Sequence, residues 1–372
     1  MRISGLANDF QKGKNINFES NDPASRQKIS PQKGVSRRFR ASRTAERPEY
    51  EKQSVEMKRI GNLYEKIISL DNLRLADEKA RRGKLRSYGV LLHDKNREAN
   101  ILALHETLKN HTFKNSEYST FTIYEPKERI IFRLPYYPDR ILHHAIMNIL
   151  EPIWVSVFTK DTYSCIKGRG IHGAMRNVKR AIKDRENARY CLKIDIRKFY
   201  PSIDHDVLKT IIRRKIKCKD TLALLDTIID STDGVPIGNY LSQYFANLML
   251  AYFDHWIKEE KRVRYYFRYA DDMVFLASTK EELHILLADI KKYLAALKLT
   301  LKGNEQIFPI AENRADKHGR GLDFVGFVFY HNQTLMRKSI KQNFCRNMDA
   351  RLYDQFMVEQ NSFMDNMMYS HD

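Results

Sequence analysis

The chain has 372 residues, 42% of them hydrophobic, and so can bury a core large enough for two or three domains, which excludes a wholly disordered chain. Its 65 lysine and arginine residues outnumber 46 acidic residues, and the formal net charge of +19 predicts nucleic acid as the leading partner. We find no apolar run of about 20 residues and no signal-peptide pattern, and we expect a cytoplasmic protein with no membrane partner. The four cysteines have neither zinc-site spacing nor the density of a disulfide scaffold.

Residues 1–55 are polar and basic and lack apolar periodicity. They are predicted to form a flexible arm, which is either a solvated tail or a segment that orders on RNA. Helical spacing of apolar residues then predicts one helix over residues 55–75, followed by the basic run KARRGKLR.

Residues 119–134 alternate like a pair of strands, and a helical period begins after two prolines. Asp139 is placed to cap this helix. The expected buried stripe is Ile141, Leu142, Ala145, Ile146, Ile149 and Leu150. His143 and His144 are adjacent and cannot share one helix face, so packing or surface roles are favoured over metal binding.

The second half of the chain predicts the order β-α-α-β-β-α. The expected elements are a strand within 188–204, helices over 205–216 and 240–257, two strands within 263–278 and a helix over 281–299. Such an order is typical of a split βαβ, ferredoxin-like antiparallel sheet with helices on one face, and the predicted class is α+β.

Three aspartates carry the candidate chemistry. Asp195 ends the first of these strands, and Asp271 and Asp272 occupy the tip of the later hairpin in the stretch FRYADDMVFLAS. Each is individually typical of a turn. If the strands are neighbours, the three carboxylates meet at one edge of the sheet. In so basic a protein they predict a site for two Mg²⁺ ions about 4 Å apart, which stabilise a phosphoryl transfer.

The residues around these aspartates resemble the motifs of reverse transcriptases. The palm blocks are LKIDIRKFYPSID, GVPIGNYLSQYFAN, FRYADDMVFLAS and GLDFVGFVFY, and two blocks from IFRLPYY and DTYSCIKG onward are similar to the finger motifs of bacterial members. The resemblance covers roughly residues 85–335. It implies a right-hand polymerase with fingers, palm and thumb, here divided as a basic arm (1–55), N-terminal helix and fingers (56–190), palm (191–330) and a short or truncated thumb (331–372).

The resemblance also implies roles for individual residues. Asp195, Asp271 and Asp272 would hold Mg²⁺, with Mn²⁺ as a substitute, and Asp271 is the firmer of the hairpin pair because strand neighbours point apart. Tyr200 would exclude a 2′-hydroxyl, although packing beside Phe199 is the alternative. Gly238 would let the backbone approach the nucleotide. Further expected contacts to the deoxynucleoside triphosphate are Ile237, Lys127, Arg129, Arg133 and Arg140. Expected contacts to nucleic acid are Lys167, Arg169, Ser242, Gln243 and Lys302.

One block departs from many reverse transcriptases, which carry Gln-Gly where this chain has Ile237-Gly238 and end in Ser-Pro where it has Ser242-Gln243. This variant resembles the enzymes of diversity-generating retroelements, which copy a template RNA into cDNA with errors at adenines and work with a small basic accessory protein. Because Ile lacks the hydrogen-bonding groups of Gln, base-pair geometry would be checked less strictly. A structural role for Ile237, packing under the turn, is the alternative.

Other functions remain open at this point. A retron, group II intron-like or phage-defence reverse transcriptase would share the palm and differ in its biological role. A non-catalytic RNA-binding protein on a palm fold belongs to another class, and retention of all three acids argues against it. A palm-type nucleotide cyclase has paired acids but no need for finger motifs or so basic a surface. The leading prediction is an RNA-directed DNA polymerase that binds template RNA, primer and deoxynucleoside triphosphates.

Overall fold

The computed structural model describes residues 58–124 and 128–346. The predicted arm at 1–55, Lys127 and most of the predicted thumb lie outside these residues. Within them, no helix combines the length and the apolar character needed to cross a bilayer.

Four helices open the described chain, and they are α2 (Tyr64–Ile68), α3 (Leu70–Ala80), α4 (Tyr88–Asp94) and α5 (Arg97–Lys109). The prediction of one helix over 55–75 is wrong, because the chain turns out of the helix at Ser69, where ψ is 141°. The Ser69 hydroxyl accepts a hydrogen bond from the Asn72 N–H and caps α3. Ile60, which was expected in the helix, forms instead a parallel bridge with Ile216.

The predicted strand pair is an antiparallel hairpin of β1 (Ser119–Ile123) and β2 (Arg129–Arg133), with Phe121 opposite Ile131. A π-helical turn, η1 (Tyr136–Arg140), leads directly into α6 (Ile141–Val155). Asp139 is not the cap of α6, because its side chain accepts no hydrogen bond from a helix N–H. The Asp139 carboxylate is buried and accepts a hydrogen bond from the Ser116 N–H at 3.0 Å. The stripe on α6 is confirmed, except that Ile149 is partly exposed.

The central sheet has the strand order β4-β5-β3-β6, all antiparallel. Its strands are β3 (Tyr190–Ile194), β4 (Tyr265–Tyr269), β5 (Asp272–Ala277) and β6 (Gln306–Pro309). Numbered in chain order, this is the 2-3-1-4 arrangement of the predicted ferredoxin-like sheet. The α+β class is confirmed.

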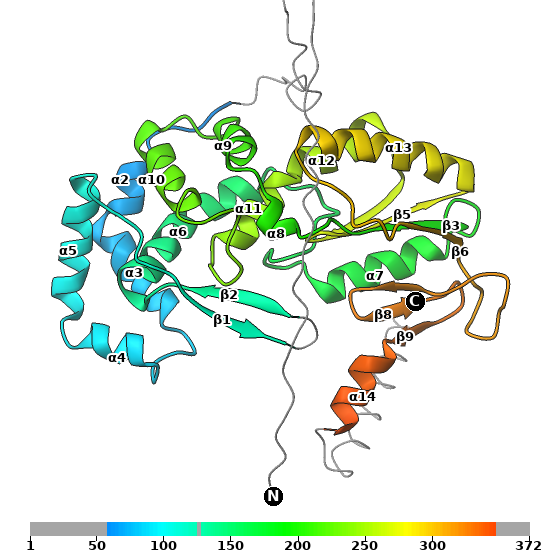
Figure 1. Ribbon diagram of the computed structural model, residues 1–372, viewed down its shortest axis with the longest axis horizontal. Coiled ribbons are helices and arrows are strands. Elements are labelled where there is room, and N and C mark those ends of the chain that lie inside the picture. Colours follow the sequence, from blue (N-terminus) through cyan, green and yellow to red (C-terminus); the bar gives the residue numbers. More distant parts are fainter. Residues whose placement is uncertain (1–57, 125–127, 347–372) are drawn as a thin grey trace, which may run out of the picture. The chain divides into compact units, whose positions relative to one another are not determined.

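Helices cover the sheet on both faces, so the expectation of one covered face is wrong. Between β3 and β4 the chain forms α8 (Phe199–Ser202), α9 (His205–Arg213), α10 (Lys219–Ile229), α11 (Ser242–Met249), α12 (Ala251–His255) and η2 (Trp256–Glu260), and α13 (Lys280–Ala296) follows β5. Leu192 and Phe275 pack into the cluster on the side of α13, whereas Cys191 and Val274 pack with α7 (Ile171–Ile182). Figure 1 shows α13 and α7 on opposite sides of these strands. Helix α10 was not predicted.

A second small sheet packs below α7 and contains β7 (Leu322–Phe324), β8 (Phe327–Phe329) and β9 (Thr334–Met336). It has this position because Leu322, Phe324 and Phe329 join the same apolar cluster as α7. Helix α14 (Lys338–Arg346) follows and buries none of its residues.

Candidate active site

The antiparallel pairing of β3 and β5 brings the three predicted aspartates to one end of the sheet. Ile194 lies opposite Met273, so Asp195 leaves β3 beside the first residue of β5, Asp272. Asp271 lies in the two-residue turn between β4 and β5. The predicted hairpin and its tip are therefore present.

The turn between β4 and β5 is stabilised by a buried arginine, Arg268. Ala270 has a left-handed backbone conformation with φ of 55°, which is costly for a residue with a Cβ. Its carbonyl accepts a hydrogen bond at 3.0 Å from Nη1 of Arg268, which also donates to Oδ1 of Asn247 at 3.1 Å. These contacts fix the backbone one residue before Asp271.

Arg268 is fully buried and pairs with the equally buried Asp254, with Nη2 and Oδ2 2.6 Å apart. Asp254 also accepts hydrogen bonds from Tyr266 at 2.6 Å and from Thr162 at 2.8 Å. Removal of two charges from water is costly, and these additional bonds offset that cost. Sequence reasoning missed this pair. The available signal was one charged residue in each of two apolar stretches, YYFRY and LAYFDHW.

Asp195 and Asp271 act on each other directly. Burial first, and then the charge and side-chain interaction of Asp195, raise the pKa of Asp271 to about 6. Lys302 contacts Asp195 on another side, with its Nζ 2.8 Å from Oδ2 and its backbone N–H donating to the Asp195 carbonyl at 2.9 Å. Two carboxylates thus share one partly buried position at the sheet edge.

Asp272 is oriented differently from Asp271. Its Oδ2 lies 3.3 Å from Nζ of Lys193, and Lys193 also donates to the carbonyl of Asp323 on β7. Oδ1 of Asp272 is buried without a hydrogen-bond partner. Burial raises the pKa of Asp272, and Lys193 acts against that effect. Within 58–124 and 128–346, no three His, Cys, Asp or Glu side chains are grouped as metal ligands.

That all three aspartates hold divalent cations stays a prediction, and their chemistry fits it. Asp195 and Asp271 present carboxylate oxygens, which Mg²⁺ prefers, and their mutual repulsion would be relieved by a cation. The charge of Asp195 also raises the pKa of Asp272, although Oδ2 of Asp272 lies against Lys193. Oδ1 of Asp272 is buried without a hydrogen-bond partner and could serve as a third carboxylate ligand.

Tyr200 lies near this pair. Burial first, then the charges of Cys165 and Asp271, raise the pKa of Tyr200 to about 12, against the opposing charges of Arg268 and Arg129. Its ring meets Phe199 nearly edge-on at 5.7 Å. Among the predicted triphosphate contacts, Arg129 on β2 is the one whose charge acts on Tyr200, and its contact with a triphosphate stays a prediction.

The turn at Ile237 and Gly238 supports the β1–β2 hairpin. The Ile237 carbonyl accepts the Phe132 N–H at 2.8 Å. Gly238 has φ of 123°, and a Cβ there would lie 2.3 Å from the Phe132 oxygen. The close approach that requires glycine is thus to strand β2, and contact with a nucleotide stays a prediction.

The remaining predicted residues lie in other environments. Arg133 and Arg140 line a separate cavity with Lys84. Lys167 and Gln243 line another cavity of about 390 Å³. Arg169 donates to the carbonyls of Thr159 and Thr162, and Ser242 is buried at the start of α11. Their contacts with substrate or nucleic acid stay predictions.

Comparison with known proteins supplies a family. Residues 124–304 match the family model described as reverse transcriptase (RNA-dependent DNA polymerase). Protein YkfC of Escherichia coli K12 is 24% identical over an alignment that covers 58% of this chain and 67% of YkfC. The group II intron-encoded protein LtrA of Lactococcus lactis is 27% identical over 34% of this chain and 23% of LtrA.

Solved structures give a more distant similarity. Apo telomerase from Candida tropicalis, truncated from the C-terminal domain, is 13% identical, with a TM-score of 0.44 over 64% of this chain and 59% of that one. The chain therefore spans a little over half of that structure and about a quarter of LtrA.

Proposed function

The chain belongs to the reverse transcriptase family, and we propose that it copies template RNA into DNA at the end of the β4-β5-β3-β6 sheet. The observation that carries this proposal is the β3–β5 pairing, which brings Asp195 to the turn that holds Asp271, while the charges of Asp271 and Arg129 both act on Tyr200. These four groups supply carboxylates for a cation, a ring at the position of the sugar and a positive charge for phosphates.

Each residue of the site would have a separate role. Asp195 and Asp271 would hold Mg²⁺, which when bound supplies positive charge to the attacking hydroxyl and to the phosphates. Arg129 would neutralise part of the triphosphate, and its place on a hairpin seated on the 237–238 turn keeps it near the site. Lys302, paired with Asp195, holds that carboxylate in place in the absence of substrate.

Tyr200 would select deoxynucleotides. Its ring is packed on Phe199, and its backbone carbonyl accepts the Val235 N–H at 2.9 Å. Because the ring packs on Phe199 and the backbone beneath it is fixed by this hydrogen bond, the ring would overlap a 2′-hydroxyl, and ribonucleotides would be rejected.

For the biological role we propose error-prone copying in a diversity-generating retroelement. The support is Ile237, which places a branched apolar side chain where many reverse transcriptases have an amide. A small basic accessory protein would then be a further partner. The similarity to LtrA and to a nuclear intron maturase of Arabidopsis thaliana favours a second candidate, an enzyme of group II intron type.

Primer extension on an RNA template with Mg²⁺ tests the polymerase activity. Asp271→Asn removes a charge from the acidic pair and should lower the extension rate by about 100-fold or more. Asp272→Asn should lower it less, because Lys193 already neutralises part of the Asp272 charge. Asp71→Asn, on a fully exposed side chain of α3, is the matched control and should be fully active. Equal extension by wild type and Asp271→Asn would refute the proposed function.

Sequencing of the products tests the biological role. Ile237→Gln adds hydrogen-bonding groups at the turn and should reduce misincorporation opposite template adenines severalfold, with little change opposite other bases. Ile237→Leu keeps the side chain apolar and serves as the control. If the glutamine variant makes adenine errors at the wild-type rate, the retroelement role loses its support and the intron-type role is preferred.

A further inference from the structure

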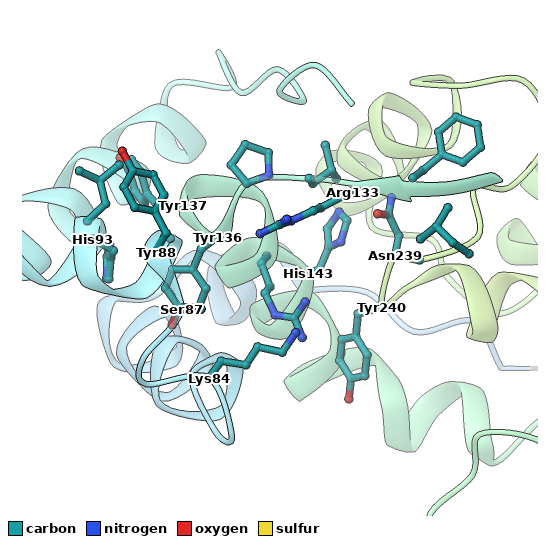
Figure 2. A pocket seen from close by; sticks show the side chains of 18 of the residues that line it. Lys84, Ser87, Tyr88, His93, Arg133, Tyr136, Tyr137, His143, Asn239 and Tyr240 are labelled. Atoms are coloured by element: carbon teal, nitrogen blue, oxygen red, sulfur yellow. The ribbon is translucent and has the colours of Figure 1, made fainter. Parts of the chain in front are cut away.

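The loop at residues 231–239 follows α10 and includes the turn that supports the β1–β2 hairpin. One side chain, Tyr118, fixes both of its ends. The Tyr118 hydroxyl lies 3.0 Å from Oγ of Ser231 and accepts a hydrogen bond from Nδ2 of Asn239 at 2.8 Å. Asn239 also lines the same cavity as Arg133 (Figure 2). Because the ends are anchored, a change confined to the middle of the loop leaves them in place.

His205, the first residue of α9, supports the middle of this loop. Its Nε2 lies 2.8 Å from the carbonyl oxygen of Gly234, and since a carbonyl only accepts, Nε2 carries the proton of this hydrogen bond. Nδ1 lies 3.1 Å from Oδ1 of Asp230, whose Oδ2 pairs with Lys209 at 2.6 Å. Both ring nitrogens are thus engaged, and the imidazole has one defined orientation.

The helix that carries His205 is held firmly. The Asp204 carboxylate caps α9 by accepting a hydrogen bond from the Val207 N–H at 3.0 Å. Val207 and Leu208 belong to the main apolar cluster of the protein. The backbone of His205 therefore cannot shift without disturbing the core, and the imidazole is a fixed point against which the loop rests.

The supported part of the loop lies against the short helix α8, which carries Tyr200. The Val235 N–H donates to the Tyr200 carbonyl at 2.9 Å. Gly234 has φ of 60°, and a Cβ there would lie 2.5 Å from the carbonyl oxygen of Pro201. The two backbone segments are in direct contact, so a displacement of Gly234 would also displace the backbone beneath the Tyr200 ring.

We propose that His205 is a positioning residue for sugar selection, which acts through the Gly234 carbonyl and the hydrogen bond from Val235 to Tyr200. The inference rests on the proposed function and adds to it a residue that acts through the loop. While the loop is held, the Tyr200 ring overlaps a 2′-hydroxyl. Once the loop is loosened, the ring yields and ribonucleotides are accepted, whereas deoxynucleotides have no hydroxyl at this position and are used as before. A role in stability alone would leave the choice of sugar unchanged.

Two substitutions separate the contacts of the two ring nitrogens. The amide nitrogen of glutamine lies close to the position of Nε2, so His205→Gln keeps a donor for Gly234. The amide of asparagine lies close to the position of Nδ1, so His205→Asn keeps a polar group for Asp230 and loses the Gly234 contact. Lys209→Gln breaks the other ion pair of Asp230 and is the matched control. Thermal unfolding verifies that the three variants fold.

The first test is primer extension by the full-length protein on an RNA template, with deoxynucleotides in one arm and ribonucleotides in the other. We expect His205→Asn to lower the ratio of kcat/KM for deoxynucleotides over ribonucleotides about tenfold, through faster use of ribonucleotides. His205→Gln and Lys209→Gln should keep the wild-type ratio. An unchanged ratio in His205→Asn, or an equal loss in His205→Gln, overturns the inference. Absence of extension by the wild type contradicts the proposed function instead.

Hydrogen exchange at the Val235 amide tests the same contact without polymerisation. This amide is protected while it donates to the Tyr200 carbonyl. In folded protein, His205→Asn should exchange it about fivefold faster or more, and His205→Gln should exchange it like wild type. Equal exchange in all of these proteins overturns the inference whether or not primers are extended, so its failure is distinguishable from failure of the proposed function.

Discussion

Asp271 and Asp272 are neighbours in sequence but differ in surroundings. Asp271 interacts with Asp195, whereas Asp272 interacts with Lys193 on the next strand. The sequence identified both as candidates, and the alternation of strand side chains favoured Asp271. It did not reveal the Lys193 contact, because that pairing depends on the register of β3 against β5.

At the same scale, His143 makes stability depend on pH. It is fully buried in α6, and burial first, then the charges of His144 and Arg140, lower its pKa to about 3. An unfolded chain has a histidine pKa of about 6.5, so the unfolded state binds a proton in this window and the folded state does not. Stability is therefore complete above about pH 6.5 and is lost as the pH falls toward 3.

Thermal or urea unfolding at pH 7 and pH 5 measures this effect. His143→Phe should reduce the stability lost over that interval by about 1.4 kcal/mol per pH unit below 6.5. His284→Asn changes an exposed histidine and should leave the loss as in wild type. Equal losses in wild type and His143→Phe would show that His143 is not the titrating group.

At the scale of elements, the β4–β5 hairpin depends on residues distant in sequence. Its strands and tip followed from the alternation in YYFRYADDMVFLA, but its support by Asp254 and Asn247 from the preceding helices did not. Helix α10 was not predicted, although its buried residues Leu224, Leu225, Ile228 and Ile229 have helical spacing. The predicted helix over 55–75 ran across Ser69. In the structure Ser69 instead caps the start of α3, so two helices replace one.

The buried pair of Arg268 and Asp254 gives a prediction for this element. Asp254→Asn leaves the Arg268 charge without its partner and should cost about 3–5 kcal/mol of unfolding free energy. The double variant Arg268→Met, Asp254→Leu should recover part of that loss but extend primers slowly, because the Ala270 carbonyl loses its donor.

Urea unfolding and primer extension together test the predictions for Asp254→Asn and the double variant. Urea unfolding compares Asp254→Asn with the control Arg74→Met, which breaks the exposed pair with Glu98 and should unfold close to wild type. Primer extension should then separate stability from positioning. A double variant that is stable and extends like wild type would show that the arginine does not position the turn.

At the scale of the whole molecule, composition and strand order were the most predictable features. The net charge follows from counting, and the order of the central sheet follows from the succession of strands and helices. The second covered face was not predictable, because α7 and the β7–β9 sheet pack together through a cluster that joins residues from Tyr163 to Phe329, which are far apart in sequence.

The net charge of +19 predicts binding that weakens steeply with salt. Each phosphate neutralised on a single strand adds about 0.7 to the slope of log K against log salt, so about six contacts would lower affinity by about two orders of magnitude between 50 and 200 mM. Titration of a labelled RNA oligonucleotide at several salt concentrations measures the slope. A flat response would contradict a charge-dominated interface.

The residue at the position of Gly238 indicates whether a related protein can place its hairpin in the same way. Only a hydrogen atom fits between that α-carbon and the Phe132 oxygen, so an alanine there would have to displace the β1–β2 hairpin and with it Arg129. A homologue with a larger residue at this position must therefore place its β1–β2 hairpin differently. A redesign of the hairpin on this protein should keep glycine at residue 238.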